Sequence, residues 1–340
     1  MIKNLILIKI IGYLFFFILL SGCRNPDSGN IGHIEKLDSA FSSIIDENAK
    51  IEIVAEGFAW CEGPLWLDES KTLIFSDVPK NIIHSWSEEA GLKKYLTPSG
   101  YTGSKPRAGE MGSNGLALSL DNKLLICQHG DRKVSMMDAS LINPNPHFIT
   151  LAGNMGGKKL NSPNDLAVRS NGDIYFTDPP YGLPGLNNDT AKEIHFNGVY
   201  RISKGKVSLL IDTLTYPNGI AFMPNGNTFI VSNSDAERPI WYAFDIDEKD
   251  LIVNARIFYD ATKEFKEERG GPDGLKVDKE GNVFATGPGG IWIFNSKGKV
   301  LGKIKLKGAV SNCAFGDGGK LLFVTNGNRV VSIALKSYLK

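Results

Sequence analysis

Apolar and polar positions follow one repeated order along this chain. An oxygen-bearing polar residue, usually followed by glycine, opens a short apolar segment, and a turn of Asp, Asn and Gly leads into a second apolar segment. The residues that open these copies, which we call the heads, are 52, 50, 54, 55 and 39 residues apart: Glu62, Asn114, Asn164, Asn218, Asp273 and Asn312. Repeats of about this length, made of short strands and tight turns, are typical of β-propeller blades.

The pattern therefore predicts an all-β fold, a six-bladed β-propeller over residues 49–340. In the first blade we expect strands over residues 64–68, 72–77, 82–87 and 92–97. The last copy is one strand short, because after residues 321–325 and 329–335 the printed sequence ends. The apolar segment Ile51–Ala55, upstream of the first head, can supply the missing strand. Ring closure between this N-terminal strand and the C-terminal blade removes an open sheet edge.

Three segments interrupt the repeat. Residues 97–112 and 178–196 are expected to lie close to the face that carries the heads, where long loops on a rigid scaffold provide substrate contacts. Residues 261–271 carry a run of Lys and Glu, which we interpret as a solvated face.

The amino terminus has the pattern of a targeting segment rather than of the fold. Residues 1–22 contain Lys3 and Lys9, no acidic residue, and a long apolar run, which predicts a signal peptide. The sequence Leu20-Ser-Gly-Cys23 resembles the bacterial lipoprotein box, and this resemblance implies cleavage before Cys23 and lipidation of its thiol. Residues 23–48 would then be the lipidated cysteine and a flexible tether. We expect a membrane-anchored protein of the bacterial cell envelope, periplasmic or surface-exposed; an uncleaved anchor and an ordinary signal peptide are the alternatives.

The near-neutral charge of the chain argues against a nucleic-acid partner. The chain has 38 Lys and Arg against 37 Asp and Glu; without residues 1–22 the balance is 36 against 37, a net charge of −1. This balance does not favour a nucleic-acid surface, and no pattern indicates an oligomeric state.

Besides Cys23, Cys61 directly precedes the first head and Cys313 directly follows the sixth. These two could meet when the ring closes, although isolated buried thiols are the favoured interpretation.

The heads themselves have the chemistry of a metal site. Glu62 and Asp273 are carboxylates and the other four are amides, an all-oxygen set that suits a hard divalent cation. Two carboxylates converging on one axis would also repel each other without a cation between them. We expect one cation, with Ca²⁺ favoured and Mg²⁺, Mn²⁺ or Zn²⁺ as alternatives.

A turn is the competing interpretation, because Asn-Gly and Asp-Gly are strong turn signals. For Asn114 and Asn312 the two interpretations stay open. Proline precedes Asn164, Asn218 and Asp273, which favours a special role for these heads.

Several strings resemble a known family, that of the gluconolactonases, senescence marker protein (regucalcin) and diisopropyl fluorophosphatase, and especially its bacterial gluconolactonase branch. The resemblance spans residues 50–337 and is carried by residues 62–66, 161–165, 175–182, 216–219 and 271–274. It implies that Glu62, Asn218 and Asp273 hold the metal, that Asn164 is a further ligand or a substrate contact, and that Asp273 is the general base. Ser162 stands where the animal lactonase has an arginine that helps to hold the sugar acid.

The function expected from these residues is a metal-dependent hydrolase that opens sugar lactones such as gluconolactone to the hydroxy acid. The metal would polarise the lactone carbonyl, and Asp273 would accept a proton from the attacking water. The candidate substrate contacts are Asn164, Ser162, Tyr181, Glu193 and His195, with Lys159 as a further candidate and His129 interpreted as a supporting channel residue.

Two alternatives remain, because a propeller fold does not determine its substrate. One is a phosphotriesterase or another esterase that uses the same metal site. The other is a non-enzymatic propeller that binds a sugar or a metal.

Overall fold

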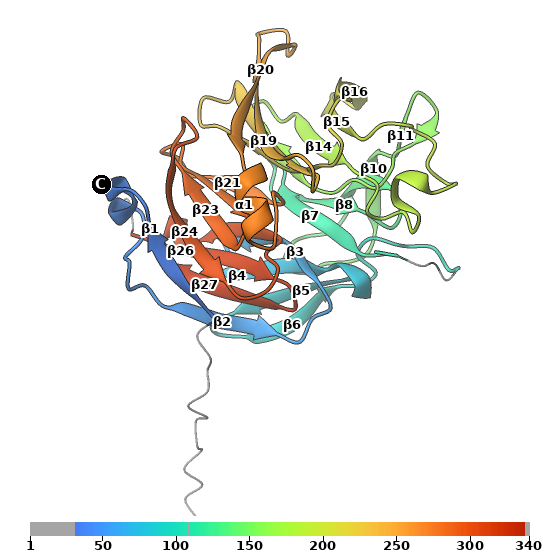
Figure 1. Ribbon diagram of the computed structural model, residues 1–340. Coiled ribbons are helices and arrows are strands. Elements are labelled where there is room, and N and C mark those ends of the chain that lie inside the picture. The colour runs from blue at the N-terminus through green and yellow to red at the C-terminus, as the bar shows by residue number, and fades with distance from the viewer. Residues whose placement is uncertain (1–30, 106, 108, 337–340) are drawn as a thin grey trace, which may run out of the picture. The chain divides into compact units, whose positions relative to one another are not determined.

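The computed structural model describes residues 31–105, 107 and 109–336, and over these residues it confirms the predicted all-β, six-bladed propeller (Figure 1). Each blade is an antiparallel sheet. Blade one consists of β3 (Cys61–Leu67), β4 (Thr72–Asp77), β5 (Ile82–Ser87) and β6 (Gly91–Leu96). Blade two consists of β7 (Ser113–Leu118), β8 (Leu124–Gln128), β9 (Lys133–Met137) and β10 (Phe148–Ala152). Blade three consists of β13 (Leu166–Val168), β14 (Ile174–Asp178), β15 (Gly198–Ser203) and β16 (Lys206–Ile211).

The remaining blades follow the same order. Blade four consists of β17 (Pro217–Phe222), β18 (Thr228–Ser234), β19 (Pro239–Ile246) and β20 (Ile252–Asp260). Blade five contains β21 (Leu275–Val277), β22 (Val283–Gly287), β23 (Gly290–Phe294) and β24 (Val300–Leu306), and blade six contains β25 (Asn312–Gly316), β26 (Leu321–Asn326) and β27 (Arg329–Ala334). The first strand of each blade contacts the first strand of the next, and β25 returns to β3. These strands therefore line the central channel.

The ring closes as the sequence predicts. Strand β2 (Ile51–Glu56) pairs antiparallel with β27, with Ile51 opposite Ile333, and completes blade six. In Figure 1 the blue β2 lies beside the red β27. The pairing joins the two ends of the propeller and leaves blade six without an unpaired outer edge on β27.

Residues 31–48 are not a flexible tether, and that prediction was wrong for this part of the segment. Strand β1 (Gly32–Lys36) pairs with β24 as a fifth strand of blade five. The 3₁₀ helix η1 (Ser39–Ser43) follows, and Phe41, Ile44 and Ile45 are buried in the core between blades five and six. Burial of three large apolar side chains is favourable enough to order a short polar segment. The predicted cleavage and lipidation of residues 1–23 lie outside the described residues.

The three interruptions of the repeat differ in structure. Residues 97–112 contain no strand or helix among those described, and residues 178–196 contain only the 3₁₀ helix η3 (Leu186–Asn188). Residues 261–271, whose Lys and Glu run we interpret as a solvated face, contain the short helix α1 (Thr262–Glu267). A hairpin of β11 (Asn154–Met155) and β12 (Lys158–Lys159) between blades two and three was not predicted. Short 3₁₀ turns η2 (Val78–Lys80) and η4 (Asp317–Gly319) follow β4 and β25.

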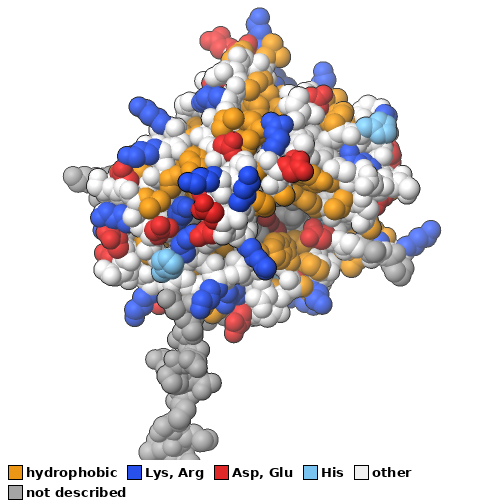
Figure 2. Space-filling view, in the orientation of Figure 1, with side chains coloured by type: hydrophobic (Ala, Val, Ile, Leu, Met, Phe, Trp, Pro, Cys, Tyr) orange, Lys and Arg blue, Asp and Glu red, His pale blue; other side chains and the backbone are white. Residues whose placement is uncertain are grey.

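Two further features agree with the sequence. Cys61, Cys127 and Cys313 are buried and not disulfide-bonded, which confirms the interpretation as isolated thiols. On the face seen in Figure 2, basic and acidic side chains are interspersed, as the near-neutral charge suggests. Within the described part of the chain, every helix is too short or too polar to cross a membrane.

Candidate active site in the central channel

All six heads lie where the innermost strands begin. Glu62, Asn114, Asn218 and Asn312 lie in β3, β7, β17 and β25, and Asn164 and Asp273 each stand two positions before the start of β13 and β21. Five of these heads are buried, and Asp273 keeps some contact with solvent. The strand arrangement therefore brings the heads to one end of the channel, as expected from the repeat.

The glycine after a head serves the contact between blades rather than a turn. A Cβ at Gly63 would lie 2.1 Å from the backbone oxygen of Asn114, and one at Gly219 would lie 2.2 Å from that of Asp273. Gly219 N also donates to Asp273 O at 3.2 Å. The next head thus packs directly on the glycine backbone, which explains the recurring head–glycine pair without invoking a turn.

Asp165 is a channel residue that the sequence reasoning missed. It stands at the position after Asn164, where four of the other copies have glycine, and it is 2 % exposed. Its Oδ2 accepts a hydrogen bond from Asn312 Nδ2 at 3.4 Å, across the ring from blade six to blade three. The signal was present in the sequence: one copy replaces the packing glycine with a carboxylate.

Asn312 acts as a hydrogen-bond donor inside the channel. Its Oδ1 accepts from Lys276 Nζ at 3.1 Å and from the backbone N–H of Cys313 at 2.9 Å. Its Nδ2 therefore faces the carboxylates, 3.3 Å from Glu62 Oε2 and 3.4 Å from Asp165 Oδ2. Asn312 lies in strand β25 and not in a turn, and its amide links Lys276 to the two acids.

Burial raises the pKa of both head carboxylates, Glu62 and Asp273. Burial raises the pKa of Glu62 to about 8; the charge of Asp165 adds to this, while hydrogen bonds from Gly63 N and Asn312 oppose it. Burial likewise raises the pKa of Asp273 well above its usual range, with further contributions from the charges of Glu62 and Asp165. Three acids in one low-dielectric space are a strong attraction for a cation.

Asn218 and Tyr181 surround Asp273. The Asn218 side chain lies close enough to the Asp273 carboxylate and the Tyr181 hydroxyl to lower the pKa of each group, against the larger effect of burial. Tyr181 stacks on Tyr216, with ring centroids 5.8 Å apart and an interplanar angle of 18°. Burial raises the pKa of Tyr181 above its ordinary value, and the charge of Asp273 contributes to the shift. The Tyr181–Tyr216 pair thus forms an aromatic wall beside the base candidate.

One unpaired amide oxygen among the heads is consistent with a bound divalent cation. Asn114 Oδ1 is buried and accepts no hydrogen bond, so an acceptor oxygen is left for a cation or a ligand hydroxyl. The described residues contain no group of three or more His, Cys, Asp or Glu side chains arranged to hold a metal. A cation here would need amide oxygens to complete the set that Glu62 and Asp273 begin.

Ser162 and His129 support the site from behind. Ser162 is fully buried; its hydroxyl donates to Pro179 O at 2.6 Å and accepts from Gly182 N at 2.9 Å. It anchors the loop that carries Tyr181, so its hydroxyl is not available to a substrate as predicted. His129 is also fully buried, with Nδ1 3.1 Å from Pro163 O and Nε2 3.3 Å from Glu110 Oε2.

Glu193 and His195 lie away from these contacts. Both are exposed, and Glu193 Oε2 accepts from the backbone N–H of Lys159 at 2.8 Å. Their contact with a substrate stays a prediction. Two residues of the 97–112 loop contribute to the site: the charge of Glu110 raises the pKa of Asp273, and Arg107 donates to Gly130 O and Gly182 O, which joins this loop to the 178–196 loop.

Comparison with known proteins gives a consistent result. Residues 60–328 match the model of the SMP-30/Gluconolactonase/LRE-like region. A gluconolactonase of Zymomonas mobilis is 36 % identical over 322 residues, covering 93 % of this chain and 89 % of that protein. The solved structure of a gluconolactonase from Xanthomonas campestris has a TM-score of 0.76 and 29 % identity, covering 89 % and 95 % of the two chains. Regucalcin from Agrobacterium tumefaciens, a calcium-binding protein, shares the fold at a TM-score of 0.66 and 19 % identity, covering 86 % of this chain and 96 % of that one. The channel architecture and these matches agree, and the chain belongs to the SMP-30/gluconolactonase/LRE-like family.

Proposed function

We propose that this protein is a lactone hydrolase that opens aldonolactones such as gluconolactone and depends on one divalent cation, Ca²⁺ by preference. The observation that carries the proposal is the channel end where Glu62 and Asp273, two carboxylates with raised pKa, lie among buried amide heads. The gluconolactonase relatives support the substrate class. Glu62, Asn218 and Asp273, with Asn164, would hold the cation.

The chain's own residues supply the remaining chemistry. When bound, the cation would polarise the lactone carbonyl and stabilise the developing negative charge. Asp273 accepts a proton from water as the water oxygen attacks the carbonyl carbon. The ring C–O bond then breaks, and the leaving oxygen takes up the proton that Asp273 accepted, which gives the hydroxy acid and returns Asp273 to its carboxylate form. Asn218 orients Asp273, and the Tyr181–Tyr216 wall limits where the sugar ring can lie.

A pH-stat assay tests both parts of the proposal. Purified protein is exhaustively chelated and then assayed with several sugar lactones and a fluorophosphate across a panel of divalent ions. We expect lactone hydrolysis that disappears on chelation and returns with Ca²⁺. Full activity without any metal by elemental analysis would overturn the cation requirement alone. Hydrolysis of the fluorophosphate only, or of nothing, would overturn the substrate class.

A further inference from the structure

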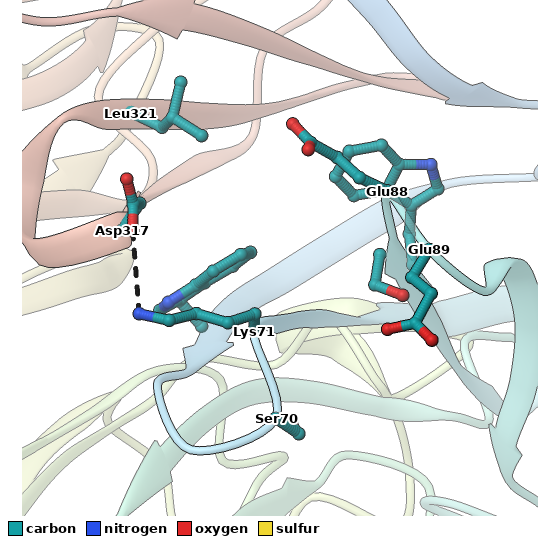
Figure 3. A pocket seen from close by; sticks show the side chains of 9 residues that line it. Ser70, Lys71, Glu88, Glu89, Asp317 and Leu321 are labelled. Atoms are coloured by element: carbon teal, nitrogen blue, oxygen red, sulfur yellow. Dashed lines mark ion pairs between the residues drawn. The ribbon is translucent and has the colours of Figure 1, made fainter.

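A separate cavity lies at the end of the propeller opposite the heads. Its volume is about 360 Å³, and it is lined by Trp66, Trp86, Lys71, Glu88, Glu89 and Asp317 (Figure 3). The turns after β3 and β5 of blade one and η4 of blade six form its rim. Because β3 and β25 begin at their heads and run away from them, these turns belong to the far face. The cavity is therefore distinct from the channel site.

Two tryptophans give the cavity a fixed aromatic surface. Trp66 stacks on Phe323, with centroids 5.3 Å apart and an interplanar angle of 17°, and Trp86 meets the same ring at 6.0 Å and 63°. Trp66 Nε1 also donates to Asp68 Oδ1 at 3.1 Å. Both indoles stay partly exposed although they are packed from behind. Rigid, partly exposed indoles offer contact area at little cost in conformational entropy.

Acidic and basic side chains both line this cavity. In Figure 3 Lys71 and Asp317 lie on one side of the cavity, and Glu88 and Glu89 come from the other. Lys71 Nζ is 3.6 Å from Asp317 Oδ1, and Lys320 Nζ is 3.3 Å from Asp317 Oδ2. Lys71 and Asp317 have φ angles of 49° and 47°, a left-handed conformation that occurs mostly in tight turns such as the two that carry them.

We propose that this cavity binds a neutral saccharide, with an apolar face of a sugar ring on the tryptophans. A sugar presents C–H faces to indole rings and hydroxyls that both donate and accept, which matches the carboxylates of Glu88 and Glu89 on one side and the Lys71–Asp317 pair on the other. An anionic ligand would be repelled by Glu88 and Glu89. An organic cation, the other usual guest of tryptophan, would be attracted by Glu88 and Glu89 but would also meet the ammonium of Lys71, so it is the competing probe in the test.

The test uses full-length protein carrying Asp273→Asn, which leaves the far face unchanged and removes turnover from the measurement. Methyl β-glucoside and cellobiose are titrated by calorimetry and by saturation-transfer NMR, with tetramethylammonium chloride as the competing probe. We expect saturable sugar binding with a Kd of roughly 1 mM. The site does not depend on the proposed activity, so its outcome and that of the lactone assay are independent.

Two pocket variants decide the location. Trp86→Ala and the double variant Glu88→Gln/Glu89→Gln, each in the Asp273→Asn background, should weaken sugar binding about tenfold or more. The same substitutions in the otherwise unchanged protein should leave kcat/KM on a lactone unaltered. The Gln pair keeps side-chain size, so it reports on the site even where Trp86→Ala fails to fold. Sugar binding that survives both variants, no saturable sugar binding, or saturable binding of tetramethylammonium in place of sugar would overturn the proposal.

Discussion

Asn312 Nδ2 lies 3.3 Å from Glu62 Oε2, so the head of blade six donates a hydrogen bond to the head of blade one at the point where the ring closes. The amide is held in this orientation because Lys276 Nζ and Cys313 N donate to its oxygen. The Asn312 side chain therefore both links blade six to blade one and places a hydrogen-bond donor beside the buried carboxylate of Glu62.

This contact predicts a graded loss of stability. Asn312→Asp replaces the donor by another carboxylate beside Glu62 and Asp165, and in a chelating buffer it should lower the free energy of unfolding by roughly 1–3 kcal/mol. Asn312→Ala is the matched control, which removes the donor without adding charge and should cost less. Chemical denaturation with and without Ca²⁺ measures both, and Ca²⁺ should restore Asn312→Asp more than Asn312→Ala. Equal loss in the two variants would contradict the electrostatic role.

Asp273 should be needed for turnover and not for folding. Asp273→Asn keeps the size of the side chain, and asparagine occupies the same place in other blades, but an amide cannot accept the proton. We expect kcat to fall by about 10²–10⁴-fold with an unchanged circular dichroism spectrum. Glu56→Gln, an exposed change in β2, serves as the control. A loss below about tenfold would assign the base role to another residue.

Gly219 should be intolerant of a single added methyl group. Its Cβ would lie 2.2 Å from Asp273 O, so Gly219→Ala must push the backbone of the candidate base away from its neighbours. We expect kcat/KM to fall at least about tenfold, since small displacements of catalytic groups are costly. Gly153→Ala is the matched control, because the nearest atom to its added Cβ is 3.6 Å away. Normal activity of Gly219→Ala would show that blade contact does not position Asp273.

Asp178, whose buried carboxylate accepts hydrogen bonds from the backbone N–H groups of Asn161 and Ser162, should make stability depend on pH. Burial raises the pKa of Asp178 to about 7, against the backbone N–H donors of Asn161 and Ser162 and the charges of Arg132 and Lys192, which lower it. A carboxyl whose pKa is higher in the folded protein contributes stability at acidic pH, and this contribution is lost as pH rises from about 4 through 7.

Urea denaturation at several pH values checks this dependence. Between pH 4 and 7 the protein should lose stability with a slope of at most about 1.4 kcal/mol per pH unit from this group, and Asp178→Asn should flatten the slope. An identical slope in the variant would contradict the raised pKa. Asp121→Asn, which changes an exposed carboxyl, is the control and should keep the slope of the unchanged protein.

The amino terminus provides a prediction that needs no structure. We expect the mature protein to begin at a lipidated Cys23, because small residues directly precede it and an apolar run lies upstream. Mass spectrometry of the native amino terminus measures this directly, and Cys23→Ser should block the modification while residues 31–340 keep their lactonase activity. An unmodified Met1, or cleavage at another position, would refute the lipoprotein interpretation.

The sequence by itself determined the propeller, its closure by Ile51–Ala55 and the position of the heads. These features follow from a local pattern that is repeated, and each copy reinforces the same interpretation of strand, turn and register. The ordered segment at residues 31–48 escaped notice because it has no repeat of its own: Phe41 and Ile45 are buried only once β24 and blade six are in place.

Only the tertiary structure decided what each head does. Six similar side chains on a ring differ in role because their neighbours come from other blades. Lys276 donates to Asn312 Oδ1, so the Asn312 Nδ2 group points at the carboxylates, whereas no donor reaches Asn114 Oδ1. The hydroxyl of Ser162, a candidate substrate contact by sequence, instead donates to Pro179 O and accepts from Gly182 N, both in the loop that carries Tyr181. Hydrogen-bond partners and burial depend on residues distant in the chain, and a local pattern carries no information about them.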